Sequence, residues 1–426
     1  MQGKTTHFTP DSNPILACLC DCHPGICRVM ALWDVASRAL GKVRRESLAV
    51  LVLAVMFNRA LVLRQLAVVC LWSIRLPSCY KRLRRLLEKP LANQAFRRAW
   101  VHAVLRTFAP GRGPLVLLWD WTTHRDQLKS LWVGLAGGGR AVPLLFWPAP
   151  IKMGGPGSQR KREDQALDEL LSMLPKGRRV VLVADRAFTS MDRIRLWADR
   201  GLFFVLRLRQ LTMIEVDGKW RTLPSLQPPE GQQRRWSNVR VGKKSRCDLR
   251  LQVVAVHQKL PAAKPVRNDK GNLTGQTRED TTWYLVSNLP VTDDIAAIYA
   301  KRMQIEETFR DLKSWLGLET ARVKNPDRRL EPLLWSATLT LTLQMAMALN
   351  PPLADSRLPR ARWRTHLPIR QTKRSDYRQI SAVREGAHDL FVWLLVWGTS
   401  FSATLQAIAV KSLRMSQRPQ CLKTKL

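Results

Sequence analysis

Residues that could handle a charged substrate recur at regular spacing between Tyr299 and Lys313, in the stretch YAKRMQIEETFRDLK. An α-helix turns about 100° per residue, so Tyr299, Arg302, Glu306 and Lys313 would lie within about 60° of one another. They would form one stripe of phenol, guanidinium, carboxylate and ammonium groups. Arg302 and Glu306 also have the spacing of an ordinary surface ion pair, so a solvated, salt-bridged face stays open as an alternative.

Beside this stripe the same helix would carry an apolar one, about 80° away. It consists of Ile305, Phe309, Leu312 and Leu316. One face of the helix would therefore pack against the protein. The neighbouring face would present its charged groups over about 21 Å, a length that matches several nucleotides of a nucleic-acid backbone.

Two further carboxylates lie at or near the ends of apolar segments that read as strands. Asp120 follows LVLLW, and Asp185 follows RRVVLVA. A buried carboxylate is costly unless it is paired or binds a metal, and each aspartate alone could be a structural cap or an ion pair. If the two strands are neighbours and the helix packs on them, Asp120, Asp185 and Glu306 can converge. Glu307 is an alternative to Glu306, but it lies about 100° round the helix, off the stripe.

Three carboxylates without Cys or His at matching positions suit Mg²⁺ or Mn²⁺ rather than zinc. Two such ions about 4 Å apart would activate a water or a 3′-hydroxyl and stabilise the leaving oxygen of a phosphate. The sequence thus predicts a two-ion phosphoryl-transfer site.

The composition points to the same kind of partner. Lys and Arg number 70 against 33 Asp and Glu, which gives a formal net charge of +37 in 426 residues. A chain that repels itself this strongly usually binds a polyanion, most often nucleic acid. Charge alone leaves a ribosome-associated or chromatin-like protein open.

The elements that must position these residues fall into several regions. Residues 30–108 read as helices, and the segment Tyr80 to Pro90 is amphipathic with one strongly basic face. This face could be solvated or could contact a DNA backbone. Its basic residues are Lys81, Arg82, Arg84 and Arg85.

Residues 109–210 predict strands and helices in an α/β arrangement. The strand of Asp120 is followed by LWVGLAGGGRAVPLLFW, a strand, a glycine-rich turn and another strand, which makes an antiparallel meander. A helix over about residues 162–174, the strand that ends at Asp185 and a strand over residues 202–209 come next.

The segment 211–282 reads as a β-rich insertion, with a hairpin turn at Asp217-Gly218 and the polar loop RNDKGNLTGQTRED. Residues 283–350 carry the strand WYLVSNLP, the helix of Glu306 and an apolar helix that ends before Pro351. The sequence over residues 351–426 predicts a basic loop followed by a last helical region.

The termini and cysteines suggest an intracellular protein. The longest apolar run, Leu48 to Phe57, is too short to span a membrane, and residues 1–29 have no signal-peptide core. These residues do contain a cluster that could bind zinc, although a start codon at Met30 would also explain it. The cluster consists of Cys18, Cys20, Cys22, His23 and Cys27. We expect the other cysteines to be reduced and buried.

The pattern Y-x2-R-x3-E-x6-K, filled by Tyr299, Arg302, Glu306 and Lys313, resembles the signature of DDE transposases of the insertion sequence four family. Its surroundings are similar to the branch typified by insertion sequence ten. The stretches LLWDWT and VADRAF resemble the family's two aspartate strands. The resemblance runs from about residue 48 to residue 410, so residues 1–29 and the tail after Lys411 are not covered.

This resemblance implies an RNase H-like α/β core with a β-rich insertion, on which Asp120, Asp185 and Glu306 bind two Mg²⁺ ions, or Mn²⁺ in their place. Tyr299, Arg302 and Lys313 would hold DNA near the cleaved end. Trp283 would stack on a base flipped out of the duplex.

The resemblance further implies that helices before the core bind the terminal inverted repeats and that residues 351–426 pair two protomers. The implied activity is cut-and-paste transposition through a hairpin intermediate, in the bacterial cytoplasm and with no membrane partner. A metal-dependent nuclease without strand transfer, or a DNA-binding protein that has lost the chemistry, are the alternatives.

Overall fold

The computed structural model describes residues 32–35, 38–58, 60–70, 74–88, 91–124, 128–155, 157–243, 249–258, 264–267, 273–277, 282–321 and 326–348. The N-terminal cysteine cluster and the predicted helical region over residues 351–426 lie outside these residues. In the part of the chain that is described, no helix is both long and apolar enough to cross a membrane.

The regular elements described before residue 109 are helices, as the sequence predicts. Helix α6 begins where the Asn93 side chain accepts a hydrogen bond of 2.8 Å from the backbone N–H of Phe96, which caps the first turn. The four helices are α3 (Lys42–Asn58), α4 (Leu63–Val69), α5 (Leu76–Leu87) and α6 (Gln94–Phe108).

Helix α5 contains the predicted basic amphipathic segment. Cys79, Leu83 and Leu87 are buried at intervals of four residues, which places them on one face of the helix. The opposite face carries Lys81, Arg84 and Arg85, all exposed, while Arg82 is half-buried. The helix packs through its apolar face on α3, α4 and α11 (Pro326–Ala348), and its cations face solvent.

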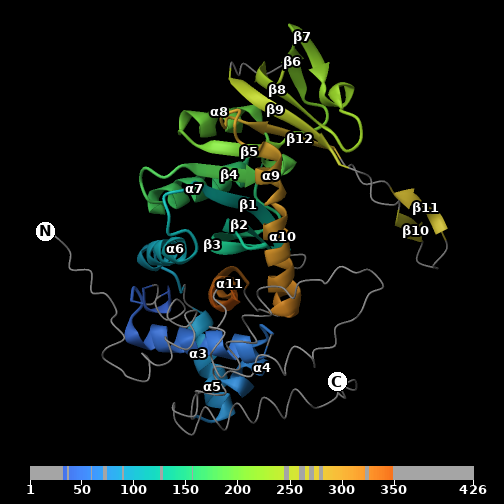
Figure 1. The fold of residues 1–426 in the computed structure, drawn as a ribbon. Helices are drawn as coiled ribbons and strands as arrows, with labels where there is room; N and C mark the ends of the chain where they lie inside the picture. Colours follow the sequence, from blue (N-terminus) through green and yellow to red (C-terminus); the bar gives the residue numbers. More distant parts are fainter. Residues whose placement is uncertain are drawn as a thin grey trace, which may run out of the picture.

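The centre of the molecule is an eight-stranded mixed sheet with the strand order β3-β2-β1-β4-β5-β12-β9-β8 (Figure 1). Strands β1, β2 and β3 form the predicted antiparallel meander, and β4 and β5 run parallel to β1. The first five strands are β1 (Leu115–His124), β2 (Leu128–Gly137), β3 (Arg140–Pro150), β4 (Val180–Ala184) and β5 (Phe203–Arg207).

The β-rich segment over residues 211–282 only partly forms separate hairpins. Two of its strands, β8 and β9, extend the central sheet through β12, and β9 is buried along most of its length. The polar stretch predicted as a loop contains β11 and the end of β10. The strands are β6 (Met213–Val216), β7 (Lys219–Thr222), β8 (Gln233–Arg240), β9 (Arg250–His257), β10 (Lys264–Arg267), β11 (Leu273–Thr277) and β12 (Thr282–Ser287).

The predicted turn between β6 and β7 is present. Asp217 and Gly218 have φ angles of 52° and 71°, the left-handed values that a tight two-residue hairpin turn requires. Short 3₁₀ turns also occur in the chain, at Arg186–Phe188, Leu223–Leu226 and Leu318–Thr320.

Helices α7 (Ser158–Met173) and α8 (Met191–Asp199) connect the strands of the central sheet. Helices α9 (Ile295–Ala300) and α10 (Met303–Arg310) follow β12 and form one column across the sheet in Figure 1. Helix α11 lies between the sheet and helices α3 and α5, and it contacts α3, α5 and β3, whereas α6 packs directly on β3. Helix α10, which carries Glu306, packs on the strands of the meander.

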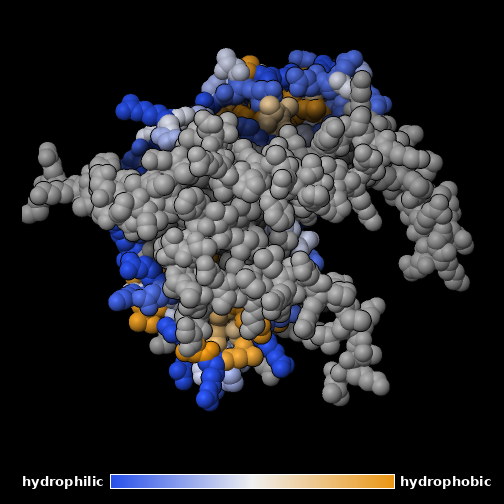
Figure 2. Space-filling model, turned by 60° about the horizontal axis from the view of Figure 1, so that its bottom comes forward, coloured by the Kyte–Doolittle hydropathy of each residue, from blue (hydrophilic) through white to orange (hydrophobic). Residues whose placement is uncertain are grey.

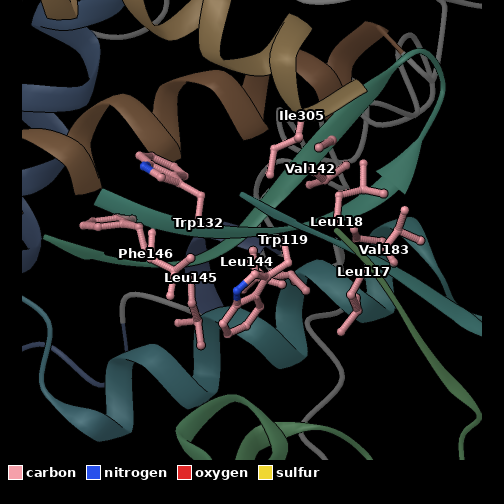
Figure 3. Packing of buried hydrophobic residues seen from close by; sticks show 14 of the residues in the cluster. Leu117, Leu118, Trp119, Trp132, Val142, Leu144, Leu145, Phe146, Val183 and Ile305 are labelled. Atoms are coloured by element: carbon pink, nitrogen blue, oxygen red, sulfur yellow. The ribbon is translucent and has the colours of Figure 1, made fainter. Parts of the chain in front are cut away.

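Aromatic side chains join these layers into one core. Trp335 of α11 is fully buried, with ring centroids 5.0 Å from Phe96 of α6 and 4.8 Å from Phe146 of β3. Phe146 in turn stacks at 4.8 Å on Trp132 of β2. Figure 3 shows Trp132 and Phe146 on the meander, with Ile305 of α10 above it. The N-terminal helices and the sheet thus share one apolar interior.

Candidate active site

Asp120 and Asp185 lie side by side on neighbouring parallel strands. The last residue pair between β1 and β4 is Trp119 with Ala184, so the two aspartates are the next residue on each strand. Asp185 follows β4 directly, as predicted. Asp120 does not end its strand: β1 continues to His124, because β2 pairs with it over this whole stretch. The expected proximity of the two carboxylates is present all the same.

Arg302 connects Asp120 to Glu306. One guanidinium nitrogen, Nη1, donates to Asp120 Oδ2 at 3.2 Å, and the other, Nη2, donates to Glu306 Oε1. The Tyr299 hydroxyl donates to Asp185 Oδ1 at 3.3 Å. The Arg302 guanidinium also lies 6.0 Å from the centre of the Tyr299 ring, so five of the residues singled out in the sequence form one contact network beside β1 and the end of β4.

The predicted continuous helix from Tyr299 to Lys313 is wrong in detail. Helix α9 ends at Ala300, and the chain tightens at Lys301-Arg302, where the Arg302 N–H bonds to the Tyr299 carbonyl at 2.8 Å. Both residues keep right-handed helical dihedrals, so α10 continues in nearly the same direction, and Tyr299, Arg302 and Glu306 stay on one side of the column. From Asp311 to Trp315 the helix widens into a π-helical turn.

Lys313 lies in this π-helical turn, and the structure gives it no contact with the acidic residues. It lies near His124 instead, four residues after Asp120 on β1. Burial, together with the charge of Lys313, lowers the pKa of His124 to about 4. The predicted stripe thus divides, with Tyr299, Arg302 and Glu306 at the acids and Lys313 toward the far end of β1.

Glu307, the alternative to Glu306, faces a different part of the protein. It pairs with Arg310 on its own helix, and with Arg140 at 3.5 Å in the turn between β2 and β3. Glu306 shares the guanidinium of Arg302 with Asp120 instead. The geometry therefore favours Glu306 as the third acid.

The surroundings of the acidic cluster favour the protonated, neutral form of Asp120. The pKa of Asp120 is raised to about 6, chiefly by burial and also by the charges of Asp185 and Glu306, while Arg302 and the Trp121 N–H oppose the shift. Burial also raises the pKa of the Tyr299 hydroxyl, so it stays protonated and donates its hydrogen bond. Burial lowers the pKa of Arg302, but the surrounding phenol and carboxylates more than offset this. A second cation would lower the repulsion between these carboxylates.

The donor set fits a hard divalent cation chemically, since all three acids supply carboxylate oxygens. Among the described residues, however, no three His, Cys, Asp or Glu side chains surround a common point where an ion could sit. The guanidinium of Arg302 lies between Asp120 and Glu306. The predicted metal triad stays a prediction that the donor chemistry supports.

Trp283 lies beside this cluster on β12. Its ring packs edge-on against that of Tyr299, with centroids 5.2 Å apart, and it is only partly buried. The structure thus places the tryptophan next to a residue that contacts Asp185. Its predicted role in stacking on a flipped base stays a prediction.

A buried network behind the two aspartates was not anticipated from the sequence. Glu163 of α7 accepts a hydrogen bond of 2.7 Å from the indole N–H of Trp121, the residue after Asp120. Its other oxygen pairs at 2.6 Å with Arg193 of α8, and both side chains are almost completely buried. Arg193 also donates at 3.4 Å to the carbonyl of Phe188, three residues after Asp185.

This Glu163–Arg193 pair therefore ties together the chain segments that follow both aspartates. A sequence signal existed in principle, because Glu163 sits on the apolar stripe of α7 with Ala166, Leu167 and Leu170. A lone carboxylate on an apolar stripe indicates a buried partner. The identity of that partner is set by the fold.

The basic residues of α5 are not part of the acidic cluster. Lys81, Arg82, Arg84 and Arg85 lie on α5, which α11 separates from the sheet (Figure 1). Figure 2 shows hydrophilic residues over much of the described surface visible in that view, with smaller apolar areas between them.

The sheet and its acids define a class first: an α/β fold with neighbouring carboxylates on two adjacent parallel strands and a third on a crossing helix. Residues 155–342 match the family model of the transposase DDE domain. This match supports a DDE transposase, a class with an RNase H-like α/β core that carries out phosphoryl transfer on DNA and typically uses divalent metal ions. No curated protein matches the chain.

The matched segment contains Asp185, Trp283 and the helical residues from Tyr299 to Lys313. Asp120 precedes it, but the pairing of β1 with β4 places this residue beside Asp185. The net charge of +37 agrees with a DNA partner.

Proposed function

We propose that this protein is a cut-and-paste DNA transposase of a bacterial insertion sequence, of the insertion sequence four family and similar to its insertion-sequence-ten branch. The observation that carries the proposal is the contact network that joins Asp120, Arg302 and Glu306, with Tyr299 on Asp185. Three of these five residues come from the signature Y-x2-R-x3-E-x6-K, and the network gathers all three acids of a DDE site.

In this proposal Asp120, Asp185 and Glu306 would hold two Mg²⁺ ions, or Mn²⁺, and ions bound there would supply activation of the attacking oxygen and stabilisation of the leaving one. Arg302 sits between two of the acids and so can orient both carboxylates or a phosphate of the bound strand. Tyr299 keeps its proton and fixes one oxygen of Asp185. Lys313, further along the same helical column, contacts the DNA backbone.

The reaction has four steps at one site. Water cleaves one strand at the element end, and the freed 3′-hydroxyl attacks the opposite strand to form a hairpin. A second water opens the hairpin, and the 3′-end then attacks target DNA. Each step replaces one phosphate oxygen by another, so one set of acids serves all four. Trp283 stacks on a base that is flipped out at the hairpin.

DNA outside the site is held by the helical region over residues 30–108, which binds the terminal inverted repeats. Lys81, Arg84 and Arg85 on the outward face of α5, with Arg82 beside them, contact phosphates. Two protomers pair through residues 351–426, so that both element ends are held in one complex. The protein acts in the bacterial cytoplasm, at the nucleoid.

The test is a strand-transfer assay with the flanking inverted repeats and Mg²⁺, comparing wild type with Glu306→Gln and with Glu307→Gln as the matched control. We expect hairpins and joined products from wild type, a loss of at least about 100-fold in Glu306→Gln, and nearly full activity in Glu307→Gln.

Other results would change the proposal in defined ways. Nicking by wild type without hairpins or joining would indicate a metal-dependent nuclease. Binding of the repeats without cleavage, equal in all three proteins, would indicate a DNA-binding protein that lacks the chemistry. Loss of activity in Glu307→Gln but not in Glu306→Gln would indicate that Glu307 is the third acid.

A further inference from the structure

Helix α10 has a third face that neither packs in the apolar core nor contacts the acids. It is formed by Gln304, Thr308 and Asp311, whose spacing of four and three residues places them on one stripe. Thr308 and Asp311 are 2% and 5% exposed, so this polar stripe is largely buried. A buried polar stripe is costly unless every group on it finds a partner.

The partners are in the turn between β2 and β3. The backbone N–H of Gly137 donates to Gln304 Oε1 at 2.9 Å, and that of Ala141 donates to Thr308 Oγ1 at 2.9 Å. The Thr308 hydroxyl also lies 2.9 Å from the carbonyls of Ala141 and Gln304, and it can donate its one proton to either of them. The stripe thus bonds to the backbone at both ends of the turn.

A charged contact completes the interface. Arg140, in the same turn, donates from Nε to Asp311 Oδ2 at 2.7 Å, and both side chains are mostly buried. Asp311 is also the first residue of the π-helical turn. The contact therefore holds the helix at the point where its winding changes.

We infer that Gln304, Thr308 and Asp311 are positioning residues, which lock α10 on the β2–β3 turn and so set the place of Glu306 relative to Asp120. The inference rests on the proposed function for its catalytic consequence. Apolar contacts, such as that between Phe309 and Trp132, allow a helix to slide or rotate with little loss. Hydrogen bonds do not, because they weaken steeply with misalignment.

The route from the turn to Asp120 runs through paired strands of one sheet. Strand β2 leads from the turn back to Trp132, which pairs directly with Asp120 on β1. Glu306 lies between Gln304 and Thr308 on the helix. The position of its carboxylate relative to Asp120 is therefore set by the sheet and by the polar contacts of Gln304, Thr308 and Asp311. A misplacement of about 1 Å in such a site can cost on the order of 100-fold in rate.

The test compares Thr308→Val, which keeps the shape of the side chain and removes its hydrogen bonds, with Thr308→Ser, which keeps the hydroxyl. Thr342→Val is the matched control, since Thr342 is also fully buried but bonds only to the Thr338 carbonyl within α11. Rates and DNA concentration dependence of end cleavage are measured on the full chain, at a temperature where all variants are folded.

We expect Thr308→Val to lower kcat by about 10- to 100-fold with KM for DNA nearly unchanged, and Thr308→Ser to retain most of the wild-type kcat. Thr342→Val should keep the wild-type kcat. Equal kcat values for Thr308→Val and Thr342→Val would overturn the inference. A rise in KM alone in Thr308→Val would do the same, because it would indicate a DNA contact rather than positioning.

A second measurement separates this inference from the proposed function. Amide hydrogen exchange at Gly137 and Ala141 should be slow in wild type and at least about 10-fold faster at Ala141 in Thr308→Val. If the exchange result holds while wild type shows no strand transfer, the interface stands and the proposed function fails. If Ala141 exchanges equally fast in both proteins, the interface does not exist as described and the inference fails, whatever the activity.

Discussion

At the scale of single residues, Arg302 does most to organise the site. Its side chain is 13% exposed and contacts two carboxylates. Asp120 lies 182 residues away in the sequence, and Glu306 lies 4 residues away. A planar guanidinium can serve two acceptors at once, which the point charge of a lysine does less well. The i,i+4 spacing of Arg302 and Glu306 is that of an ordinary surface pair, and only the contact with Asp120 distinguishes it.

His124 gives a pH-dependent prediction at the same scale. Its Nε2 atom contacts Ser130, Lys313 lies nearby, and burial is the main cause that lowers its pKa from 6.5 to about 4. The unfolded chain takes up a proton near pH 6.5, whereas the folded protein does not until about pH 4. Stability from this group is therefore full above pH 6.5 and is lost as the pH falls toward 4.

Replacing His124 by Gln removes that titration. Between pH 7 and pH 5 wild type should lose about 2 kcal/mol more unfolding free energy than His124→Gln, measured by urea denaturation at each pH. The comparison uses the change with pH, since the substitution also alters the contact with Ser130. An equal loss in the two proteins would mean that His124 titrates as it does in the unfolded chain.

At the scale of elements, the segments that follow both aspartates are held from behind by α7 and α8. Glu163 and Arg193 form a pair that is 5–6% exposed, and each makes a further hydrogen bond next to one of the acids. Removal of one partner from a buried pair leaves an uncompensated charge, whereas removal of both charges costs much less.

A double-mutant cycle tests this. Arg193→Met should lower the unfolding free energy by about 3–5 kcal/mol, and adding Glu163→Gln should recover at least about 2 kcal/mol, because Gln still accepts the Trp121 N–H. The control is Arg160→Met, which breaks the exposed pair with Asp192 and should cost less than about 1 kcal/mol. Additive losses in the cycle would mean that Glu163 and Arg193 do not interact.

At the scale of the whole molecule, the charge of +37 is distributed over many elements, and α5 presents one part of it on a single outward face. Each phosphate contact releases counterions, so DNA affinity falls with salt in proportion to the number of contacts. The slope of affinity against salt therefore counts the contacts that a given surface makes.

The triple variant Lys81→Gln, Arg84→Gln and Arg85→Gln should reduce the slope of log K against log salt by about 2 to 3, measured by fluorescence anisotropy with duplex DNA. The matched control replaces three exposed cations elsewhere, Lys161, Lys176 and Arg195, by Gln. Equal reductions of the slope in both triple variants would mean that DNA binds no particular face. An unchanged slope in the α5 variant would mean that α5 does not contact DNA.

The local sequence determined much of the site. Apolar segments that end in a carboxylate predicted the strands of Asp120 and Asp185, and helical spacing placed Tyr299, Arg302 and Glu306 together, because both patterns depend only on neighbouring residues. The glycine-rich meander and the Asp217-Gly218 turn were predicted for the same reason. The choice between Glu306 and Glu307 was indicated by spacing and is favoured by the contacts of each side chain.

Only the tertiary structure decided what lies behind these residues. Strands β8 and β9 join the central sheet, in which β9 is buried on both faces. The length of β9 and its flanking turns do not reveal this burial. Lys313 lies in the π-helical turn that begins at Asp311 and is close enough to His124 to lower its pKa. The bond between Ala141 and Thr308 spans 167 residues of sequence. Such contacts depend on which surfaces the fold brings together, and no periodicity within one segment encodes them.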